Sequence, residues 1–240
     1  MLIPGLGGDG RFWAGVAAGL ADRFDLLTID HRGAGRSDRP PGPYTIEGIA
    51  ADMLAVMDAE GIEAAHLVGH STGGAVVQTI ALDAPRRALS LVISGSWDRP
   101  DARFRATFAA RAALLDAGLA EAYQQLTHVF GYDPAFIEAH AAALDRAVAA
   151  AAQDLAPLAV TAARVRMLLG FDRSADLARI RHRTLIIGAR DDMLIPIHHA
   201  RRLRDLLPHA EYAELDGAHF HPRTDPVPFT ERLVRFLAAG

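Results

Sequence analysis

The order of its apolar segments constrains the fold of this chain more than any other sequence feature. Short segments typical of strands, most of them apolar, occur at residues 1–4, 24–29, 66–69, 89–94, 184–188 and 211–215. Apolar residues at helical spacing occupy most of the intervals, at residues 11–22, 46–60, 72–83, after Pro196 and at 226–237. Parallel strands need a long crossover, which is usually a helix. The alternation therefore predicts an α/β fold with a mostly parallel central sheet and helices on both faces.

One long segment interrupts this alternation. From Trp97 to Asp172 the sequence is rich in alanine and has helical spacing, with no run that resembles a strand. We therefore predict a core built from residues 1–96 and 173–240 and a helical cap inserted at residues 97–172. A chain of 240 residues is long enough to bury a substantial core.

The composition excludes several kinds of chemistry. The chain contains no cysteine, and all 25 of its Lys and Arg residues are arginine. It therefore lacks the groups needed for disulfides, a cysteine nucleophile, a lysine Schiff base or a Walker-type phosphate loop. Reactive side chains must come from Ser, Thr, Tyr, His, Asp, Glu and Arg.

Net charge and hydropathy argue against two classes of binding partner and by themselves indicate no other. The formal net charge of −4 is too small to predict binding to nucleic acid or to a membrane surface. No apolar run approaches the ~18 residues of a membrane span, and the N-terminus lacks the pattern of a signal peptide. We expect a cytoplasmic protein that acts on a small molecule.

A G-x-S-x-G motif, Gly69-His70-Ser71-Thr72-Gly73, lies between a predicted strand and a predicted helix. A strand that turns at once into a helix passes through a strained bend, which needs small flanking residues and exposes the central side chain. The N-terminus of the following helix also offers free N–H donors. Ser71 is therefore a candidate nucleophile, and the alternative is an ordinary N-cap serine in a Gly/Ser turn.

Candidates for two partner groups follow later strands. A serine nucleophile needs a base, and the base needs an acid that orients it. Asp191 and Asp192 follow one late strand, and His219 and His221 follow the next, which is the chain order of a hydrolase built on a parallel sheet. The same four side chains have the donor types of a metal site, but a triad leaves the same residues behind, and we expect no metal.

Taken together, these motifs resemble the α/β-hydrolase superfamily, and within it the serine hydrolases with a helical cap. The resemblance covers essentially the whole chain and depends on Gly5-Leu6-Gly7-Gly8, a D-x-R-G-x-G-x-S loop at residues 30–37, the motif around Ser71, the late acid and the turn Gly217-Ala218-His219. The opening turn, the segment at 184–196 and the cap length most resemble the aminoacrylate and carbamate hydrolases of pyrimidine breakdown and, more loosely, the enol-lactonases.

The resemblance implies a catalytic triad of Ser71, Asp192 and His219. It also implies that the backbone N–H groups of Leu6 and Thr72 bind the oxyanion. The implied reaction is hydrolysis of a small carboxylic ester, lactone, or carbamate- or amide-like substrate through an acyl-enzyme, and no cofactor is expected.

Near-duplicates compete for two of these positions. Asp192 is favoured over Asp191 because a proline follows it at the D-x-x-x-P spacing of the family. Asp98, after an earlier strand, is a third candidate that we expect instead to cap the first cap helix. His219 is favoured because it lies in the family's Gly-Ala-His turn, whereas His221 precedes a proline and is expected to be exposed or at the pocket rim.

The cap supplies the candidates for a substrate pocket. Aromatic residues are frequent in the inserted segment, and we expect Trp97, Tyr123, Phe130 and Tyr132 to form an apolar roof over the serine. The alternative is that these rings form only the core of the cap itself.

Two other functions remain open at this stage. A catalytically silent ligand-binding module on the same fold has no support from an intact set of triad residues, although fold alone does not decide function. A dinucleotide-dependent oxidoreductase is suggested by Gly5-x-Gly7-x-x-Gly10, with Asp30 about 20 residues further on. That interpretation leaves the order and spacing of the triad candidates unexplained.

The sequence departs from the resembled family at its start. The family usually has two strands ahead of the oxyanion turn, which this chain lacks, and Pro4 stands where a histidine is common. The strand expected at residues 24–29 would then form a sheet edge with unpaired backbone groups. We expect this edge to be covered in a homodimer or another contact, or the natural chain to begin upstream of Met1.

Overall fold

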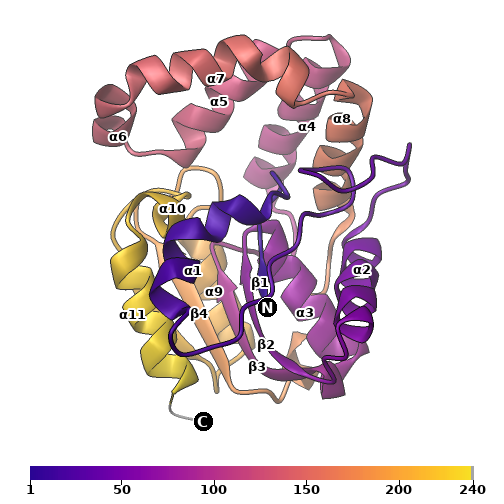
Figure 1. Cartoon of the computed structure of the whole chain (residues 1–240), viewed down its shortest axis with the longest axis vertical. Helices are drawn as coiled ribbons and strands as arrows, with labels where there is room; N and C mark the ends of the chain where they lie inside the picture. Colours follow the sequence, from indigo (N-terminus) through magenta and orange to yellow (C-terminus); the bar gives the residue numbers. More distant parts are fainter. Residues whose placement is uncertain (239–240) are drawn as a thin grey trace.

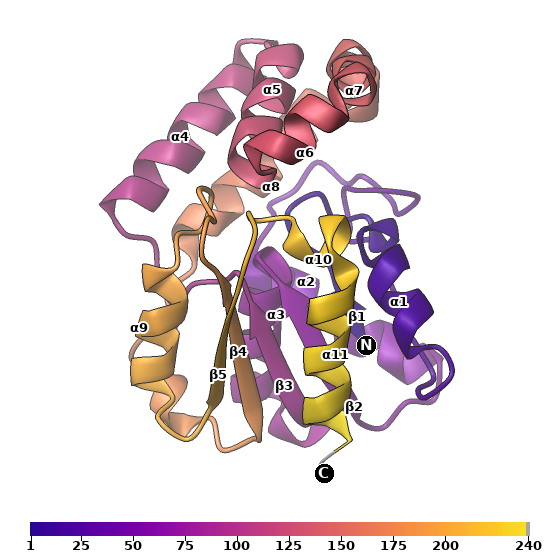
Figure 2. The ribbon, with the colours of Figure 1, turned by 90° about the vertical axis from the view of Figure 1, so that its left-hand side faces the viewer.

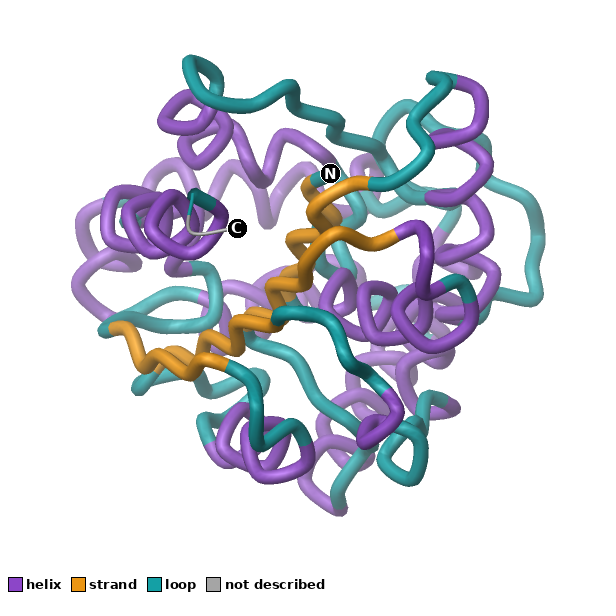
Figure 3. Tube along the Cα trace, turned by 90° about the horizontal axis from the view of Figure 1, so that it is seen from below, coloured by secondary structure: helices purple, strands orange, loops and turns teal. Residues whose placement is uncertain are grey.

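A five-stranded parallel sheet runs through the centre of the molecule. The computed structural model describes residues 1–238, and its strands are β1 (Leu2–Ile3), β2 (Ala65–His70), β3 (Ala88–Ser94), β4 (Thr184–Ala189) and β5 (Glu211–Leu215). Neighbours in space follow the order β1-β2-β3-β4-β5, and each pair is parallel. Seen from below, the strands form one twisted band surrounded by helices (Figure 3). The predicted fold class is confirmed.

Helices cover both faces of the sheet (Figures 1 and 2). One face carries α1 (Ala14–Leu20) and α11 (Pro226–Leu237), and the other carries α2 (Ile46–Ala59), α3 (Thr72–Asp83) and α9 (His198–Leu206). Successive strand residues point to opposite faces, so Leu67 packs on the α2 and α3 side and Val68 packs on the α1 and α11 side. Because both faces are buried, the central strands are continuous apolar runs.

Five helices form a separate layer above the carboxyl ends of the strands (Figure 2). They are α4 (Ala102–Asp116), α5 (Ala120–Gly131), α6 (Pro134–Ala139), α7 (Ala141–Asp154) and α8 (Leu158–Met167). Within the layer, α4 packs on α8 and α5 packs on α7. The two ends of the layer meet, since the Arg173 N–H donates a hydrogen bond to the Asp98 carbonyl oxygen at 3.0 Å. The division of the chain into a core and a cap stays a prediction.

Short helical turns complete the regular structure. They are 3₁₀ turns at Gly10–Trp13, Pro85–Arg87, Leu168–Gly170 and Leu177–Arg179, and the four-residue helix α10 (His221–Thr224). Among residues 1–238, the helices are too short or too polar to cross a membrane.

The segment at residues 24–29 is not the regular strand that the sequence predicts. It pairs with β1 through a single bridge between Thr28 and Leu2, and the Leu27 carbonyl accepts a hydrogen bond from the Leu2 N–H at 2.8 Å. Since β1 contains only two residues, it offers this segment little backbone to pair with. The segment lies at the sheet edge, as expected, with Asp25 exposed. A homodimer across this edge stays a prediction.

The predicted cap of the first helix in the upper layer is wrong. Asp98 does not cap α4; Asp101 does, because its Oδ1 accepts the Phe104 N–H at 2.7 Å. Asp98 is instead fully buried, and its Oδ2 binds the Arg202 guanidinium at 2.7 Å. It therefore joins the start of the upper layer to α9.

We expect Thr45→Ala to lower the free energy of unfolding by about 1 kcal/mol, because the Thr45 hydroxyl caps α2. Its Oγ1 accepts the Gly48 N–H at 2.9 Å. Thr45→Ser keeps this acceptor and should retain most of the stability. Asp225→Ala is a second control, since Asp225 precedes α11 but makes no side-chain capping bond. Urea denaturation measures the differences, and equal losses in Thr45→Ala and Asp225→Ala would contradict the capping role.

Candidate active site

Ser71 occupies a strained turn between β2 and α3. Its backbone has φ of 55° and ψ of −118°, and it is the one non-glycine residue among residues 1–238 with a positive φ. A Cβ atom on Gly69 would overlap the Gly73 carbonyl oxygen, and one on Gly73 would overlap the Ile3 carbonyl oxygen. Glycine is therefore required on both sides of Ser71. Strained backbone of this kind concentrates at functional sites.

The glycine-rich turn after β1 lies directly beside Ser71. A Cβ atom on Gly5 would lie 3.2 Å from Ser71 Cβ and 3.7 Å from Ser71 Oγ. The Gly8 N–H donates to the Gly5 carbonyl oxygen at 2.9 Å, which closes the turn around Leu6. Thr72 is the first residue of α3, so its N–H has no acceptor within the helix. Both predicted oxyanion donors thus lie in backbone next to Ser71.

Asp30 connects this turn to the loop that follows residues 24–29. Its Oδ1 accepts the Gly10 N–H at 2.8 Å, and its Oδ2 accepts the Arg36 N–H at 2.9 Å. In a dinucleotide-binding fold the corresponding carboxylate binds the ribose of the cofactor. Here both carboxylate oxygens of Asp30 accept hydrogen bonds from backbone N–H groups of the protein itself. This removes the main support for a dinucleotide-dependent oxidoreductase.

Asp192 and His219 form a buried hydrogen-bonded pair. His219 Nδ1 lies 2.6 Å from Asp192 Oδ2, and both side chains are almost fully buried. The other carboxylate oxygen, Oδ1, accepts the N–H groups of Leu194 at 2.9 Å and Ile195 at 2.7 Å. Asp191, the competing acid, is exposed. The structure therefore brings Asp192, and not Asp191, to the histidine.

Ser71 and His219 line the same cavity. Among the described residues, no hydrogen bond joins Ser71 Oγ to the His219 ring. In ligand-free enzymes the hydrogen bond between nucleophile and base is often long and tightens only when substrate binds. The arrangement is therefore compatible with a serine that transfers its proton to His219.

His221 is neither exposed nor part of the cavity wall, contrary to the sequence-based prediction. It is buried, and its Nδ1 lies 3.2 Å from the Ala218 carbonyl oxygen. Its ring also lies 5.8 Å from that of His70, which is 4.7 Å from the His219 ring. Burial lowers the pKa of His221 to about 4 and that of His70 well below its ordinary value. Both therefore stay neutral at physiological pH beside His219.

A cavity of about 520 Å³ lies between the core and the upper helical layer. The core lines it with residues 4–9, Arg11, Phe12, His70, Ser71, Leu194, His219, Phe220 and Arg223, and the layer with Phe108, Arg111, Tyr123, Gln124, Thr127, His128, Tyr132, Leu155 and Leu168. This volume falls within the range of pockets that bind small organic molecules.

Two of the four predicted pocket residues line this cavity. Tyr123 and Tyr132 belong to its wall, but Trp97 and Phe130 do not. Trp97 is fully buried and packs on Phe104 with ring centroids 4.7 Å apart, and Phe130 packs against the same hydrophobic core. Tyr123 and Tyr132 therefore agree with the predicted pocket, whereas Trp97 and Phe130 agree with the alternative that the rings only pack in a core.

The remaining polar groups in the cavity wall, above all Arg111 of α4, are not among the residues predicted from the sequence. Arg111 lies one helical turn after Phe108, in the buried stripe of the helix that also contains Phe104 and Leu115. A charged residue within an apolar stripe is the sequence signal that could have revealed it, because charged side chains are rarely buried without a partner.

One group of side chains outside the cavity has the donor types of a metal site. Ligand atoms of Asp101, His198 and His199 lie within 4.8 Å of one another. His198 Nε2 is 2.8 Å from Asp101 Oδ2, so a hydrogen bond already accounts for this pair. None of the three residues lines the cavity around Ser71.

The fold and this geometry agree with a comparison to known protein families. A family model described as the alpha/beta hydrolase fold matches residues 1–131. The chain belongs to the α/β-hydrolase family, and it is a hydrolase, as the sequence predicts.

Particular members of the family are similar over nearly the whole chain. A protein of Caulobacter segnis provisionally named carbamate hydrolase RutD is 40% identical over 240 residues, which cover 99% of this chain and 90% of the relative. The protein of the same name from Caulobacter vibrioides is 41% identical over 239 residues, covering 99% and 89%. The crystal structure of an enol-lactonase from Burkholderia xenovorans LB400 matches with a TM-score of 0.89 and 25% identity, covering 99% and 90%. The predicted likeness to both groups is confirmed.

Buried histidines around the site should make the stability of the protein sensitive to acid. His31, whose N–H binds the Gly8 carbonyl at 2.8 Å, is fully buried with neither ring nitrogen hydrogen-bonded. Burial, reinforced by the charge of Arg164, lowers the pKa of the His31 ring to about 3. Since an unfolded histidine has a pKa of about 6.5, acid protonates the unfolded chain first. This residue should therefore weaken folding as the pH falls from about 6.5 towards 3.

We expect His31→Leu to reduce the dependence of the unfolding free energy on pH. The slope of the unfolding free energy against pH should fall by up to about 1.4 kcal/mol per pH unit between about pH 6.5 and pH 4. The reason is that the variant has one fewer buried neutral imidazole to protonate on unfolding. Urea denaturation across this range measures the slope. The exposed His209 provides the control, since His209→Leu removes no buried ring. An unchanged slope in His31→Leu would contradict the assignment.

Proposed function

We propose that this hydrolase uses Ser71 as the nucleophile, His219 as the general base and acid, and Asp192 to orient His219. One observation carries the proposal: buried Asp192 binds His219 Nδ1 at 2.6 Å, while His219 and Ser71 line one cavity. A carboxylate on Nδ1 fixes the tautomer that leaves Nε2 free to accept a proton. The strained backbone of Ser71 supports the same role.

The reaction follows from these positions. Ser71 Oγ attacks the substrate carbonyl carbon while its proton passes to His219 Nε2, and Asp192 stabilises the charged imidazolium. The negative oxygen of the tetrahedral intermediate accepts hydrogen bonds from the N–H groups of Leu6 and Thr72. His219 then protonates the leaving group, which departs and leaves an acyl-enzyme. Water, deprotonated by His219, hydrolyses this ester and restores Ser71.

A small ester, lactone, or carbamate- or amide-like compound fits the proposed site. The cavity of about 520 Å³ has room for a small molecule only. The names of the Caulobacter relatives and of the Burkholderia neighbour, carbamate hydrolase and enol-lactonase, support the same range of acyl compounds. A protein that binds such a compound without turnover is the alternative, and the labelling experiment below distinguishes the two.

We expect a fluorophosphonate to label Ser71, because the probe forms a covalent bond only with an activated serine. Mass spectrometry of the labelled peptide identifies the residue.

Two variants provide the controls for this labelling. Ser71→Ala should abolish labelling and lower turnover of p-nitrophenyl esters by at least about 10³-fold. Ser96→Ala should change neither, because Ser96 is also buried but its hydroxyl has no partner and lies outside the cavity wall. Labelling at another serine, or a fully active Ser71→Ala protein, would refute the proposal.

We expect Asp192→Asn to lower turnover by about 10⁴-fold, as in other triads that lose the orienting acid, because the wrong histidine tautomer is then favoured. The neighbouring replacement Asp191→Asn makes the same chemical change at an exposed position and should leave turnover nearly unchanged. Steady-state kinetics with a p-nitrophenyl ester compares the two proteins. A larger loss of turnover in Asp191→Asn would show that Asp191, and not Asp192, is the acid that orients the histidine.

A further inference from the structure

The cavity wall contains a buried guanidinium that lacks a carboxylate partner. Arg111 of α4 is only 2% exposed, and its Nη2 donates a hydrogen bond to Thr127 Oγ1 at 2.7 Å. Its Nε and Nη1 atoms have no hydrogen-bond partner, and none of the ion pairs among residues 1–238 includes Arg111. Buried charges in proteins are usually paired and hydrogen-bonded. The free donors of Arg111 therefore require an explanation.

Neighbouring side chains hold this guanidinium in one orientation. Its central carbon lies 4.6 Å from the ring centroid of Tyr123 and 5.5 Å from that of Phe108, a geometry typical of cation–π contacts. The Thr127 hydroxyl donates its own proton to the Tyr123 carbonyl at 2.9 Å, so its oxygen is free to accept from Arg111. Arg111 is thus fixed before any ligand enters.

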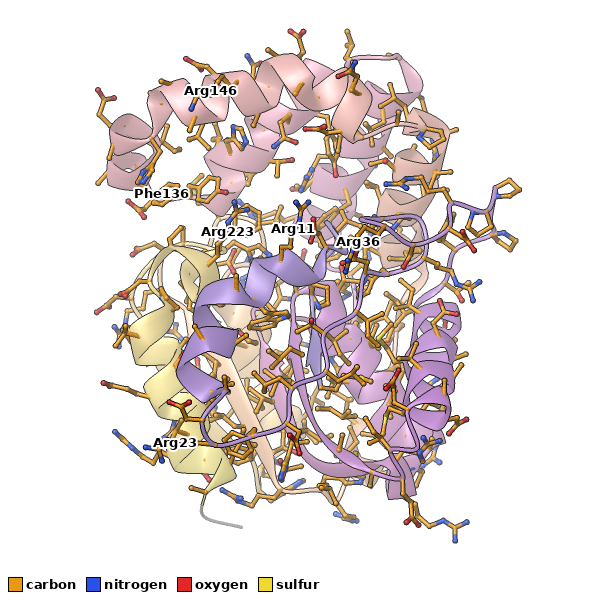
Figure 4. All side chains as sticks on the ribbon, viewed as in Figure 1. Arg11, Arg23, Arg36, Phe136, Arg146 and Arg223 are labelled. Atoms are coloured by element: carbon orange, nitrogen blue, oxygen red, sulfur yellow. The ribbon has the colours of Figure 1, made fainter. Side chains whose placement is uncertain are left out.

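The other charged groups in the cavity wall do not neutralise Arg111. The single carboxylate among the lining residues belongs to Asp9, and it binds the side chain of Arg11. Arg223 also lines the cavity without an ion pair among the described residues. Figure 4 shows Arg11 and Arg223 at the level where the core meets the upper helical layer. The wall therefore has an excess of positive charge, although the whole chain has a net charge of −4.

A second buried arginine, which lies behind the cavity wall, adds to this positive charge. Arg164 of α8 is 3% exposed, and its Nε and Nη2 atoms have no hydrogen-bond partner. Its guanidinium lies against the glycine-rich turn, where a Cβ atom on Gly8 would overlap Nη2. Arg164 does not line the cavity, so it contributes charge and not contact. Positive charges around a low-dielectric cleft attract and concentrate anionic ligands.

We infer that Arg111 binds a carboxylate group of the substrate, so that the enzyme prefers small acyl compounds that carry a negative charge away from the reacting carbonyl. This inference rests on the proposed function of Ser71. A guanidinium presents paired N–H donors that match the two oxygens of a carboxylate. The substrate would thereby supply the partner that the protein itself does not provide for Arg111.

A matched pair of esters tests this preference. Mono-p-nitrophenyl succinate and p-nitrophenyl butyrate have the same leaving group and acyl chains of equal length, but only the first carries a carboxylate. Wild-type enzyme should have the higher kcat/KM for the succinate. Arg111→Gln should lower kcat/KM for the succinate by about 10- to 100-fold, mainly through KM, because a charge-assisted hydrogen bond is lost. The ratio of kcat/KM for the succinate to that for the butyrate should therefore fall towards one.

Control variants separate binding from structural effects. Arg146→Gln removes the same charge from α7, where Arg146 is exposed (labelled in Figure 4), and should leave the ratio of the two esters unchanged. Arg111→Lys keeps the charge without the paired donors and should retain part of the preference. If Arg111 acted only through packing, Arg111→Gln would lower both rates equally, and that result would overturn the inference.

A measurement on the wild-type protein does not depend on the folding of any variant. Succinate should protect Ser71 from the fluorophosphonate at concentrations where neutral succinamide gives no protection. Equal protection by the two compounds, or none by either while butyrate ester is hydrolysed, would refute the role of Arg111. Absence of both labelling and ester hydrolysis would instead refute the proposed function of Ser71.

Discussion

The close approach of three backbone segments around Ser71 is the constraint on which the site depends. The end of β1, the end of β2 and the start of α3 meet where Gly69 and Gly73 leave no space for a Cβ atom. Because α3 begins against β1, the turn that follows β1 is forced to lie beside Ser71, with Gly5 in contact distance of its side chain. Packing of backbone on backbone therefore sets both the strained conformation of the proposed nucleophile and the position of the N–H groups proposed to bind the oxyanion.

Much of the fold could be predicted from the sequence because the sheet is buried on both faces. The central strands β3 and β4 lie between helices, so each is a largely apolar run that stands out against the polar loops. Residues 24–29 have a similar composition but form no regular strand, because the neighbouring β1 contains two residues and supports one bridge only. The regularity of an edge segment depends on its partner, and the local sequence does not contain that information.

The candidate site, too, could be predicted from the sequence only in part. Asp192 could be separated from Asp191 because a proline at fixed spacing marks the loop in which Leu194 and Ile195 donate their N–H groups to the carboxylate. The burial of His221 depends on α10, a helix of four residues that is too short to leave a periodic pattern. The positive charge of the cavity wall could not be predicted from composition either. Acidic and basic residues nearly balance in the chain as a whole, whereas Arg111 is buried without a carboxylate partner.

The hydrogen bond between the Arg173 N–H and the Asp98 carbonyl has a consequence for the evolution of this protein. A helical layer whose entry and exit lie side by side can be lengthened, shortened or replaced without a change in strand order beneath it. Arg111 and Tyr123 belong to that layer, whereas the three proposed catalytic residues belong to loops at the ends of the strands. With the roles proposed above, substrate preference and bond-breaking chemistry lie on separate parts of the chain, so the first could change while the second is kept.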